Sequence, residues 1–374
     1  MTGRLTLPRR FQRFVIKNHT DISQNLAAGK GIYRILVCRP NHRLGNTLLM
    51  TPLITELEQR YKGAEIDILS EGDIAKEVFT SFFSVKNIFC LPKRGFKHPV
   101  SFLHLLFRVR RTPYDLIIDP CVGSGFSRTL TKFLKGRHKL GFSDSTKHSG
   151  LTHDVPVSVA MPHMAKRPIN MVRWISKEDQ RASEEFPSLD IRLTHEERAS
   201  GRRAVIEMLS TSQQTSTPPV VGIFANATGA KRYPKEWWSE FIRAFKELSP
   251  QSSIIELIPA HGHSMLGEEW PGYYSSDIRR MGAVMAGTDL MITADCGVMH
   301  LAVASRVTTV GMFCVTDAGA YEPYGLGSHA LTTKGMTASD AAKHIVEAFP
   351  ALTAPKGMAS SVSASPQYHV MHSI

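Results

Sequence analysis

Short apolar runs alternate with amphipathic segments along the first half of the chain. Runs typical of strands lie at 33–39, 65–70, 86–92, 114–120 and 139–143. Segments with apolar residues every three or four positions, typical of helices, lie between them at 46–61, 73–83, 100–111 and 124–135. This alternation predicts a parallel sheet with helices on its faces. We therefore expect one doubly wound domain with the strand order 3-2-1-4-5.

The second half repeats the pattern. Predicted strands lie at 220–228, 253–260, 289–295 and 307–313, and predicted helices at 235–248, 276–287, 297–305 and 337–348. The segment 210–219 has no apolar residue and ends in two prolines, so it predicts a linker. We expect an α/β chain with two Rossmann-like doubly wound domains, at 31–209 and 220–350, facing each other across a cleft. Residues 1–30 would form a basic extension and 351–374 a disordered tail.

Charge and cysteine usage narrow the function classes. The chain of 374 residues has a formal charge of +12, which favours phosphates, nucleotides, nucleic acid or an anionic membrane as partners. The basic groups lack the interleaved aromatic residues of a nucleic-acid surface, so we expect no nucleic-acid partner. The five cysteines form no CxxC pair, which argues against a disulfide framework or a zinc site.

The sequence contains no pattern typical of a membrane-spanning helix or a signal peptide. No apolar run approaches the roughly 20 residues that span a bilayer, so we expect a cytoplasmic protein. The first residues, MTGRLTLPRRFQRFVIKNH, mix arginines with apolar residues. Two interpretations stay open for them: peripheral contact with the anionic inner face of the cytoplasmic membrane, or a solvated extension.

The stretch TADCGVMHLAVA, residues 293–304, predicts a strand that ends at Asp295, a turn at Cys296 and Gly297, and a helix that starts at once. The unpaired N–H groups of a helix N-terminus suit a phosphate or diphosphate, and Gly297 would let it approach the backbone. In the alternative interpretation Asp295 only caps the helix and His300 faces the core.

A second turn of the same kind is NATGAKRYPKEWW, residues 226–238, which places Lys231 and Arg232 just before a helix. Two cations there predict a further anion site, although plain surface charge explains them equally well. The chain has no GxGxxG after its first strand, and no P-loop, HExxH or DxD motif. We therefore expect no cofactor and no metal.

Three stretches together resemble the family 9 glycosyltransferases, the bacterial heptosyltransferases of lipopolysaccharide core assembly. They are RILVCRPNHRLGNTLLMTPLITEL, KRYPKEWW, and DLMITADCGVMHLAVASRVTTVGMF followed by YEPYG, and the resemblance spans about residues 33–348. It implies a GT-B fold that binds an acceptor on the N-terminal domain and a nucleotide sugar, typically ADP-heptose, on the C-terminal one.

The resemblance also assigns roles to residues. Lys231 would contact the donor diphosphate, the backbone of Cys296 and Gly297 would cradle it, and Asp295 and His300 would shape the donor pocket. Asn226 and Thr228 occupy positions of phosphate-contacting polar residues. Arg39, Arg43 and Gly45 lie on the acceptor side.

Two departures from the family bear on chemistry. The turn after the first strand usually has an aspartate after its glycine, the presumed general base, and this chain has Asn46, whose amide cannot accept the proton. The glutamate expected after the strand at 253–260 is also displaced. Asp119 or His42 could replace the base; alternatively, Asp119 fixes a loop and Asn46 caps its helix.

The sequence therefore predicts inverting transfer of a sugar, heptose from ADP-heptose, to a phosphorylated lipid-linked saccharide acceptor. The competing hypothesis is a catalytically silent scaffold of the same fold that binds a nucleotide sugar or glycolipid. Asn46 supports the scaffold, whereas Lys231 and the turn at Gly297 favour the enzyme, because both would stabilise a departing diphosphate.

Overall fold

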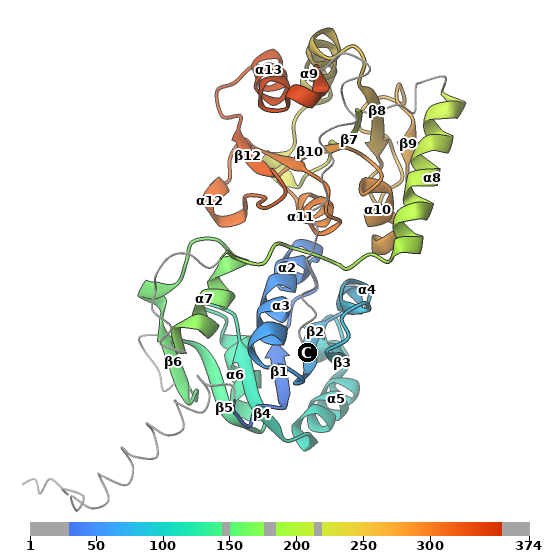
Figure 1. Cartoon of the computed structure of the whole chain (residues 1–374). Helices are drawn as coiled ribbons and strands as arrows, with labels where there is room; N and C mark the ends of the chain where they lie inside the picture. The colour runs from blue at the N-terminus through green and yellow to red at the C-terminus, as the bar shows by residue number, and fades with distance from the viewer. Residues whose placement is uncertain (1–29, 144–149, 176–184, 213–218, 354–374) are drawn as a thin grey trace, which may run out of the picture.

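The computed structural model describes residues 30–143, 150–175, 185–212 and 219–353, and contains two parallel sheets, each with helices packed on it (Figure 1). Nearly all of the predicted extension at 1–30 and most of the linker at 210–219 lie outside these residues. The predicted tail at 351–374 lies outside them from residue 354 on, whereas residues 351 and 352 belong to the ordered 3-10 turn Pro350–Leu352. Within the described residues, no helix is long and apolar enough to cross a membrane.

The first sheet has the strand order β3-β2-β1-β4-β5-β6, and every pairing is parallel. Its strands are β1 (Arg34–Cys38), β2 (Glu65–Glu71), β3 (Val85–Leu91), β4 (Tyr114–Asp119), β5 (Gly136–Ser143) and β6 (His153–Pro156). The predicted order 3-2-1-4-5 is confirmed, and β6 extends it by a strand that is too short and polar for its pattern to be recognised.

The second sheet repeats this order as β9-β8-β7-β10-β11-β12, again all parallel. Its strands are β7 (Val220–Phe224), β8 (Ser253–Leu257), β9 (Gly272–Tyr273), β10 (Leu290–Ala294), β11 (Thr309–Phe313) and β12 (His329–Thr332). In such sheets ligands gather at the carboxyl ends of the central strands, where the connections diverge. Those strands are β1 and β4 in the first sheet, and β7 and β10 in the second.

Helices of the first half are α2 (Leu44–Leu48), α3 (Thr51–Arg60), α4 (Ile74–Phe79), α5 (Pro99–Arg111), α6 (Gly125–Phe133) and α7 (Lys166–Ile175), with 3-10 turns at Gly95–Lys97 and Val157–Val159. The single helix predicted at 46–61 is in fact two, α2 and α3. Pro52 lies in the first turn of α3. It has no N–H to continue the hydrogen-bond ladder and its ring crowds the preceding turn, so α2 stops at Leu48.

Helices of the second half are α8 (His195–Thr211), α9 (Lys235–Leu248), α10 (Ile278–Met285), α11 (Gly297–Ala304), α12 (Ala318–Tyr321) and α13 (Ala338–Ala348), with 3-10 turns at Gly229–Lys231 and Pro350–Leu352. The sequence placed α8 in the N-terminal domain, but α8 packs on α10 beside the second sheet (Figure 1). We propose that the domain boundary lies in the extended segment 186–194, before α8.

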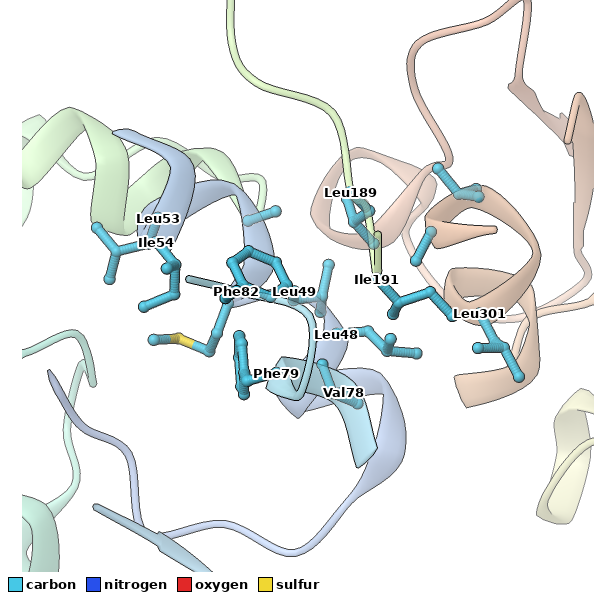
Figure 2. Packing of buried hydrophobic residues seen from close by; sticks show 14 of the residues in the cluster. Leu48, Leu49, Leu53, Ile54, Val78, Phe79, Phe82, Leu189, Ile191 and Leu301 are labelled. Atoms are coloured by element: carbon cyan, nitrogen blue, oxygen red, sulfur yellow. The ribbon is translucent and has the colours of Figure 1, made fainter. Parts of the chain in front are cut away.

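One hydrophobic cluster joins the two halves. Leu48 of α2 and Phe82 after α4 pack in the same cluster as Leu189 and Ile191 of the extended segment and Leu301 of α11 (Figure 2). All five side chains are at most 3% exposed. Continuous burial of this kind holds the end of the first sheet that carries α2 against the start of α11.

Candidate active site

Two neighbouring strands of the second sheet, β7 and β10, end beside each other and bring the predicted donor turns together. The ammonium Nζ of Lys231, in the turn after β7, lies 2.7 Å from Oδ2 of Asp295, directly after β10. The Lys231 side chain is 33% exposed and that of Asp295 is 6% exposed. A cation that is still accessible is therefore fixed beside the first turn of α11.

The first turn of α11 has backbone N–H groups without partners inside the helix. Cys296 is the N-cap residue, with no side-chain oxygen to occupy the free N–H groups. Burial raises the pKa of the Cys296 thiol to about 11, while the nearby backbone of Met299 and Val298 lowers it. The thiol is therefore neutral, and it adds no negative charge that would repel an anion at this helix end.

His300 lies one turn into α11 and is only 5% exposed. Burial lowers the pKa of its imidazole to about 4, because the charged form loses its hydration; His163 and Lys231 lower this pKa further, while Asp295 raises it. The ring is neutral and lies 6.3 Å from the ring of Tyr321. His300 thus packs in the interior, as the alternative interpretation has it, directly behind the site.

Asn226 and Thr228 precede Lys231 on the same turn. The Oδ1 atom of Asn226 is buried and has no hydrogen-bond partner in the described part of the chain. Thr228 is exposed and begins the 3-10 turn that ends at Lys231. An amide oxygen with no partner is costly in a folded protein unless a ligand or water supplies a donor.

The turn after β1 is organised by Asn41, a residue that the sequence analysis did not single out. Its Oδ1 accepts hydrogen bonds from the backbone N–H of Arg43 (2.9 Å) and from Nδ2 of Asn46 (3.1 Å). Helix α2 begins at Leu44, with Arg43 at the N-cap position, so the idea that Asn46 caps its helix is wrong. The Asn46 amide instead donates back to the turn and fixes its shape.

His42, on the same turn, has geometry suited to proton transfer. Its Nδ1 lies 2.9 Å from Oε2 of Glu71, and its side chain is 52% exposed. Glu71 ends β2, the strand next to β1. A carboxylate at Nδ1 keeps the proton on that nitrogen and leaves the lone pair of Nε2 free.

Asp119 sits at the carboxyl end of β4 but is completely buried. Its oxygens accept from the Ser127 hydroxyl (2.7 Å), from Nε of Arg128 (2.9 Å) and from the Cys121 backbone (3.1 Å). The contacts with Ser127 and Arg128 tie the end of β4 to α6, and the contact with Cys121 fixes the loop between them. This placement favours the loop-fixing role of Asp119 over the role of general base.

Arg39 and Asn46 line a small cavity of about 60 Å³ on the acceptor side, together with Val122, Met164 and Arg167. Nη1 of Arg39 donates to the Cys121 thiol (2.9 Å), which holds the guanidinium against the loop after β4. Arg43, by contrast, is exposed at the start of α2. Two arginines, Arg39 and Arg167, therefore meet at a cavity that Asn46 also borders.

The acceptor turn and the donor turn meet at two glycines. A Cβ atom on Gly45 would lie 3.2 Å from Cα of Gly297 and 3.0 Å from Cδ2 of His300. The first turns of α2 and α11 are thus in backbone contact, and only glycine at position 45 permits it without a shift. We call this the glycine contact.

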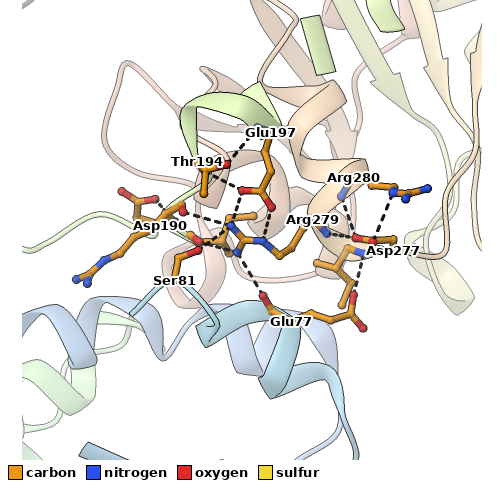
Figure 3. Close-up of polar contacts among 11 residues, drawn as sticks. Glu77, Ser81, Asp190, Thr194, Glu197, Asp277, Arg279 and Arg280 are labelled. Atoms are coloured by element: carbon orange, nitrogen blue, oxygen red, sulfur yellow. Dashed lines mark hydrogen bonds and ion pairs between the residues drawn. The ribbon is translucent and has the colours of Figure 1, made fainter. Parts of the chain in front are cut away.

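Arg279 makes a second link between the two halves, which we call the arginine junction (Figure 3). From α10 its guanidinium donates to Glu197 (2.6 Å), to Ser81 after α4 (2.9 Å) and to the carbonyl of Ile191 (2.9 Å). Glu77 accepts from the backbone N–H of Ile278 (3.0 Å). These bonds tie α4, the extended segment, α8 and α10 at one point.

The resemblance implies a glutamate after the strand predicted at 253–260, and neither Glu256 nor Glu269 takes that place beside the donor turns. Glu256 in β8 is buried and accepts from Ser264 and from the backbone of Met265, both at 2.6 Å. Glu269 lines a groove of about 460 Å³ against α9. None of the residues assigned to the donor lines that groove, so it does not belong to this site.

Two parallel doubly wound sheets whose central strand ends face each other define a fold of the GT-B type. The model of glycosyltransferase family 9 (heptosyltransferase) matches residues 275–344, which include Asp295, Gly297 and His300. The predicted resemblance to family 9 is thereby confirmed. No curated protein matches the chain.

Solved structures share the fold over most of the chain. A family 9 glycosyltransferase from Veillonella parvula has a TM-score of 0.66 at 18% identity, covering 85% of this chain and 89% of that one. The E. coli heptosyltransferase WaaC with ADP has a TM-score of 0.63 at 17% identity, covering 84% and 99%. The E. coli ADP-heptose heptosyltransferase II has 0.63 at 18%, covering 85% and 98%.

Proposed function

We propose that the chain transfers heptose from ADP-heptose, with inversion, to a hydroxyl of a phosphorylated lipid-linked saccharide at the inner face of the cytoplasmic membrane. The observation that carries the proposal is the Lys231–Asp295 pair beside the first turn of α11; Asp295 lies in the segment that matches family 9. The similar E. coli proteins are described as binding ADP or using ADP-heptose, which supports this choice of donor.

The donor half is built to stabilise a leaving diphosphate. Negative charge grows on the diphosphate as the bond to the sugar breaks, and Lys231 and the backbone N–H groups at Gly297 are already fixed where they would meet it. Asn226 can donate through Nδ2 to a phosphate oxygen, and its buried, unpartnered Oδ1 can accept from a sugar hydroxyl. These groups need no metal to do so.

On the acceptor half, His42 takes the role of general base, with Glu71 as the group that orients it. Nε2 of His42 accepts the proton of the acceptor hydroxyl while that oxygen attacks the anomeric carbon from the face opposite the leaving ADP. Arg39 and Arg167, at the cavity beside Asn46, offer positive charge to an acceptor phosphate. Asn46 orients the hydroxyl by hydrogen bonding.

Product formation from ADP-heptose and a phosphorylated core acceptor tests the proposal. His42→Gln should lower kcat by roughly 10²–10⁴-fold. His344→Gln, at an exposed histidine on α13, is the matched control and should leave kcat unchanged. A wild-type protein that binds ADP-heptose but yields no product with any acceptor would favour the catalytically silent scaffold. Normal turnover of His42→Gln would remove His42 from the mechanism.

A further inference from the structure

Helices α5 and α6 expose large apolar side chains on the first domain. Val100, Leu103 and Phe107 of α5 are 80%, 49% and 51% exposed, and Phe126 of α6 is 52% exposed. The three on α5 are spaced at i, i+3 and i+7, so they form one stripe of the helix. Single exposed apolar residues are ordinary, but a stripe of large ones that continues onto a neighbouring helix marks an interaction site.

Aromatic contacts show that the two helices share this surface. The rings of Phe102 and Phe126 stack with centroids 6.4 Å apart, and those of Phe107 and Phe133 meet edge to face at 5.6 Å. The buried sides of both helices pack in one cluster against the first sheet, through Leu106, Val109, Leu130 and Leu134. The opposite sides therefore face outward together. We call this surface the α5–α6 face.

Positive charge surrounds the apolar stripe. Residues 92–135 include nine lysines and arginines but only two acidic residues, a net charge of +7 in a chain whose total is +12. Both acidic residues are engaged: Asp115 accepts from the backbone of Tyr33 and Arg34, and Asp119 is buried against Arg128. Exposed Arg108, Arg111 and Lys132 are thus not neutralised by any carboxylate of this segment.

We propose that the α5–α6 face docks on an anionic lipid bilayer. Apolar side chains that enter the acyl boundary, next to cations that meet lipid phosphates, are the combination that an interfacial surface requires. A second copy of the chain is a poor occupant, because two such faces would oppose positive charge with positive charge. Nucleic acid is equally poor, because it offers no apolar phase for Val100 and Leu103.

The surface also borders the acceptor side of the active site. Val122, four residues before Phe126, lines the same cavity as Asn46 and Arg39. A Cβ atom on Gly72 would lie 2.7 Å from Cε of Lys93, in the segment leading to α5, and 3.7 Å from Cβ of His42. Docking therefore places the His42 turn near the lipid surface. This last step deepens the proposed function and rests on it; the docking itself does not.

Vesicle co-sedimentation of the full chain tests the proposal. Vesicles of phosphatidylglycerol should bind the wild-type protein in a salt-sensitive way, and vesicles of phosphatidylcholine should bind it far less. Replacing Arg108, Arg111 and Lys132 together by Gln should weaken binding by on the order of 100-fold, since each cation near an anionic surface contributes about a factor of five. Leu103→Ser with Phe107→Ser and Phe126→Ser should weaken it by tens of fold.

Matched controls are Arg203→Gln and Ile206→Ser on α8, an exposed cation and an exposed apolar residue away from the face. Both should bind vesicles like wild type, and all variants should melt within a few degrees of it. Turnover of a water-soluble acceptor should be the same in every variant as in the wild type. A wild-type protein that shows no such turnover would contradict the proposed function but not the docking. Equal vesicle binding by the wild type and both triple variants would overturn the proposal. Binding that is lost only when residues 1–29 are deleted would overturn it as well. Self-association abolished by the same variants would overturn it too.

Discussion

The glycine contact and the arginine junction both join the two halves of the molecule, but they use opposite means. At the glycine contact, Gly45 and Gly297 bring two helix starts together through backbone alone. At the arginine junction, Arg279 is 9% exposed and binds one carboxylate, one hydroxyl and main-chain carbonyls from three separate elements.

The two contacts differ in the free energy that is lost when each is separated. A contact of two glycines contains no side-chain hydrogen bond or ion pair, so the glycines themselves contribute little more than van der Waals contact, and the burial of Leu48 and Leu301 beside them holds the two helices together. Separating the arginine junction would strip a buried guanidinium and Glu197 of their partners, which is expensive. The two contacts therefore differ in what their separation would lose: van der Waals contact at the glycines, and charged hydrogen bonds at the junction. The following experiments would break or sharpen this comparison.

The largest expected effect is on stability, from Arg279→Met. The variant leaves Glu197 without its charged partner and the carbonyl of Ile191 without its donor, so we expect the free energy of unfolding to fall by about 3 kcal/mol, the lower end for a broken buried pair because Glu197 is partly exposed and keeps the Thr194 N–H. Arg280→Met is the matched control: Arg280 is 77% exposed, and its contact with Asp277 is 3.7 Å long. Urea unfolding measures both. A loss below about 0.5 kcal/mol for Arg279→Met would be no more than a surface change and would refute the role.

Acid should loosen the two regions in different pH windows. His300, packed against Gly45, is neutral in the folded chain, with a pKa of about 4 against 6.5 when exposed. The unfolded chain binds the proton first, so stability falls as the pH drops from 6.5 to 4, by about 3 kcal/mol in total. Arg279 lowers the pKa of Glu197, so the stability from that pair is fully present above its ordinary value of 4.5 and is lost only at lower pH.

His300→Leu isolates the first of these windows. The variant should remove most of the fall in stability between pH 6.5 and 4, while wild type and variant should behave alike below it. Buried His163 also has a lowered pKa and titrates in both proteins, so it cancels in the difference. Equal pH dependence in the two proteins would mean that His300 is not held neutral by the fold.

Lys231→Ala acts at the donor side of the glycine contact and should be felt in catalysis. We expect kcat to fall by on the order of 10²-fold, because a fixed charge matters most as negative charge develops on the leaving group. Arg232→Ala, its exposed neighbour, should stay near the wild-type rate. Steady-state kinetics with saturating donor measures both, and an unchanged kcat for Lys231→Ala would take this residue out of the site.

Gly45→Ala should have the smallest effect and the most specific one. The added Cβ meets Gly297 at 3.2 Å and His300 at 3.0 Å, an overpacking that we expect to cost about 1 kcal/mol and to lower kcat/KM by several fold. Gly125→Ala serves as the control, since nothing lies within 4 Å of a Cβ at that position. If Gly45→Ala matched Gly125→Ala in stability and kinetics, the two helix starts would not need close approach.

The donor side was largely accessible from sequence because its signals are local. Asp295 directly follows β10 and Lys231 lies in the turn after β7, and β7 and β10 had to be neighbours in any doubly wound sheet. Their pairing thus follows from order along the chain. The same logic predicted the strand order of the first sheet but missed β6, β9 and β12, which have 4, 2 and 4 residues.

The acceptor side and the arginine junction depend on side chains that meet only in three dimensions. The contact between Glu71 and His42 depends on the pairing of β1 with β2, which the local sequence around either residue does not indicate. Arg279 stands next to Arg280 in the predicted helix 276–287, and no spacing along the chain distinguishes the buried arginine from the exposed one. Asp119 had the right strand end for a base, but the direction of its side chain, toward Ser127 and Arg128, was not encoded in any spacing.

The close packing of α8 on α10 also decides how the chain can be divided. A Cβ on Gly201 would lie 2.0 Å from the carbonyl oxygen of Ala283, so the two helices touch through backbone and cannot be spaced apart by a larger residue. A fragment cut at the apparent linker would leave α10 with a bare apolar side and would be expected to aggregate. A fragment that starts before α8, near residue 186, carries its own cover. It is the natural starting material for measuring nucleotide binding to the second domain by itself.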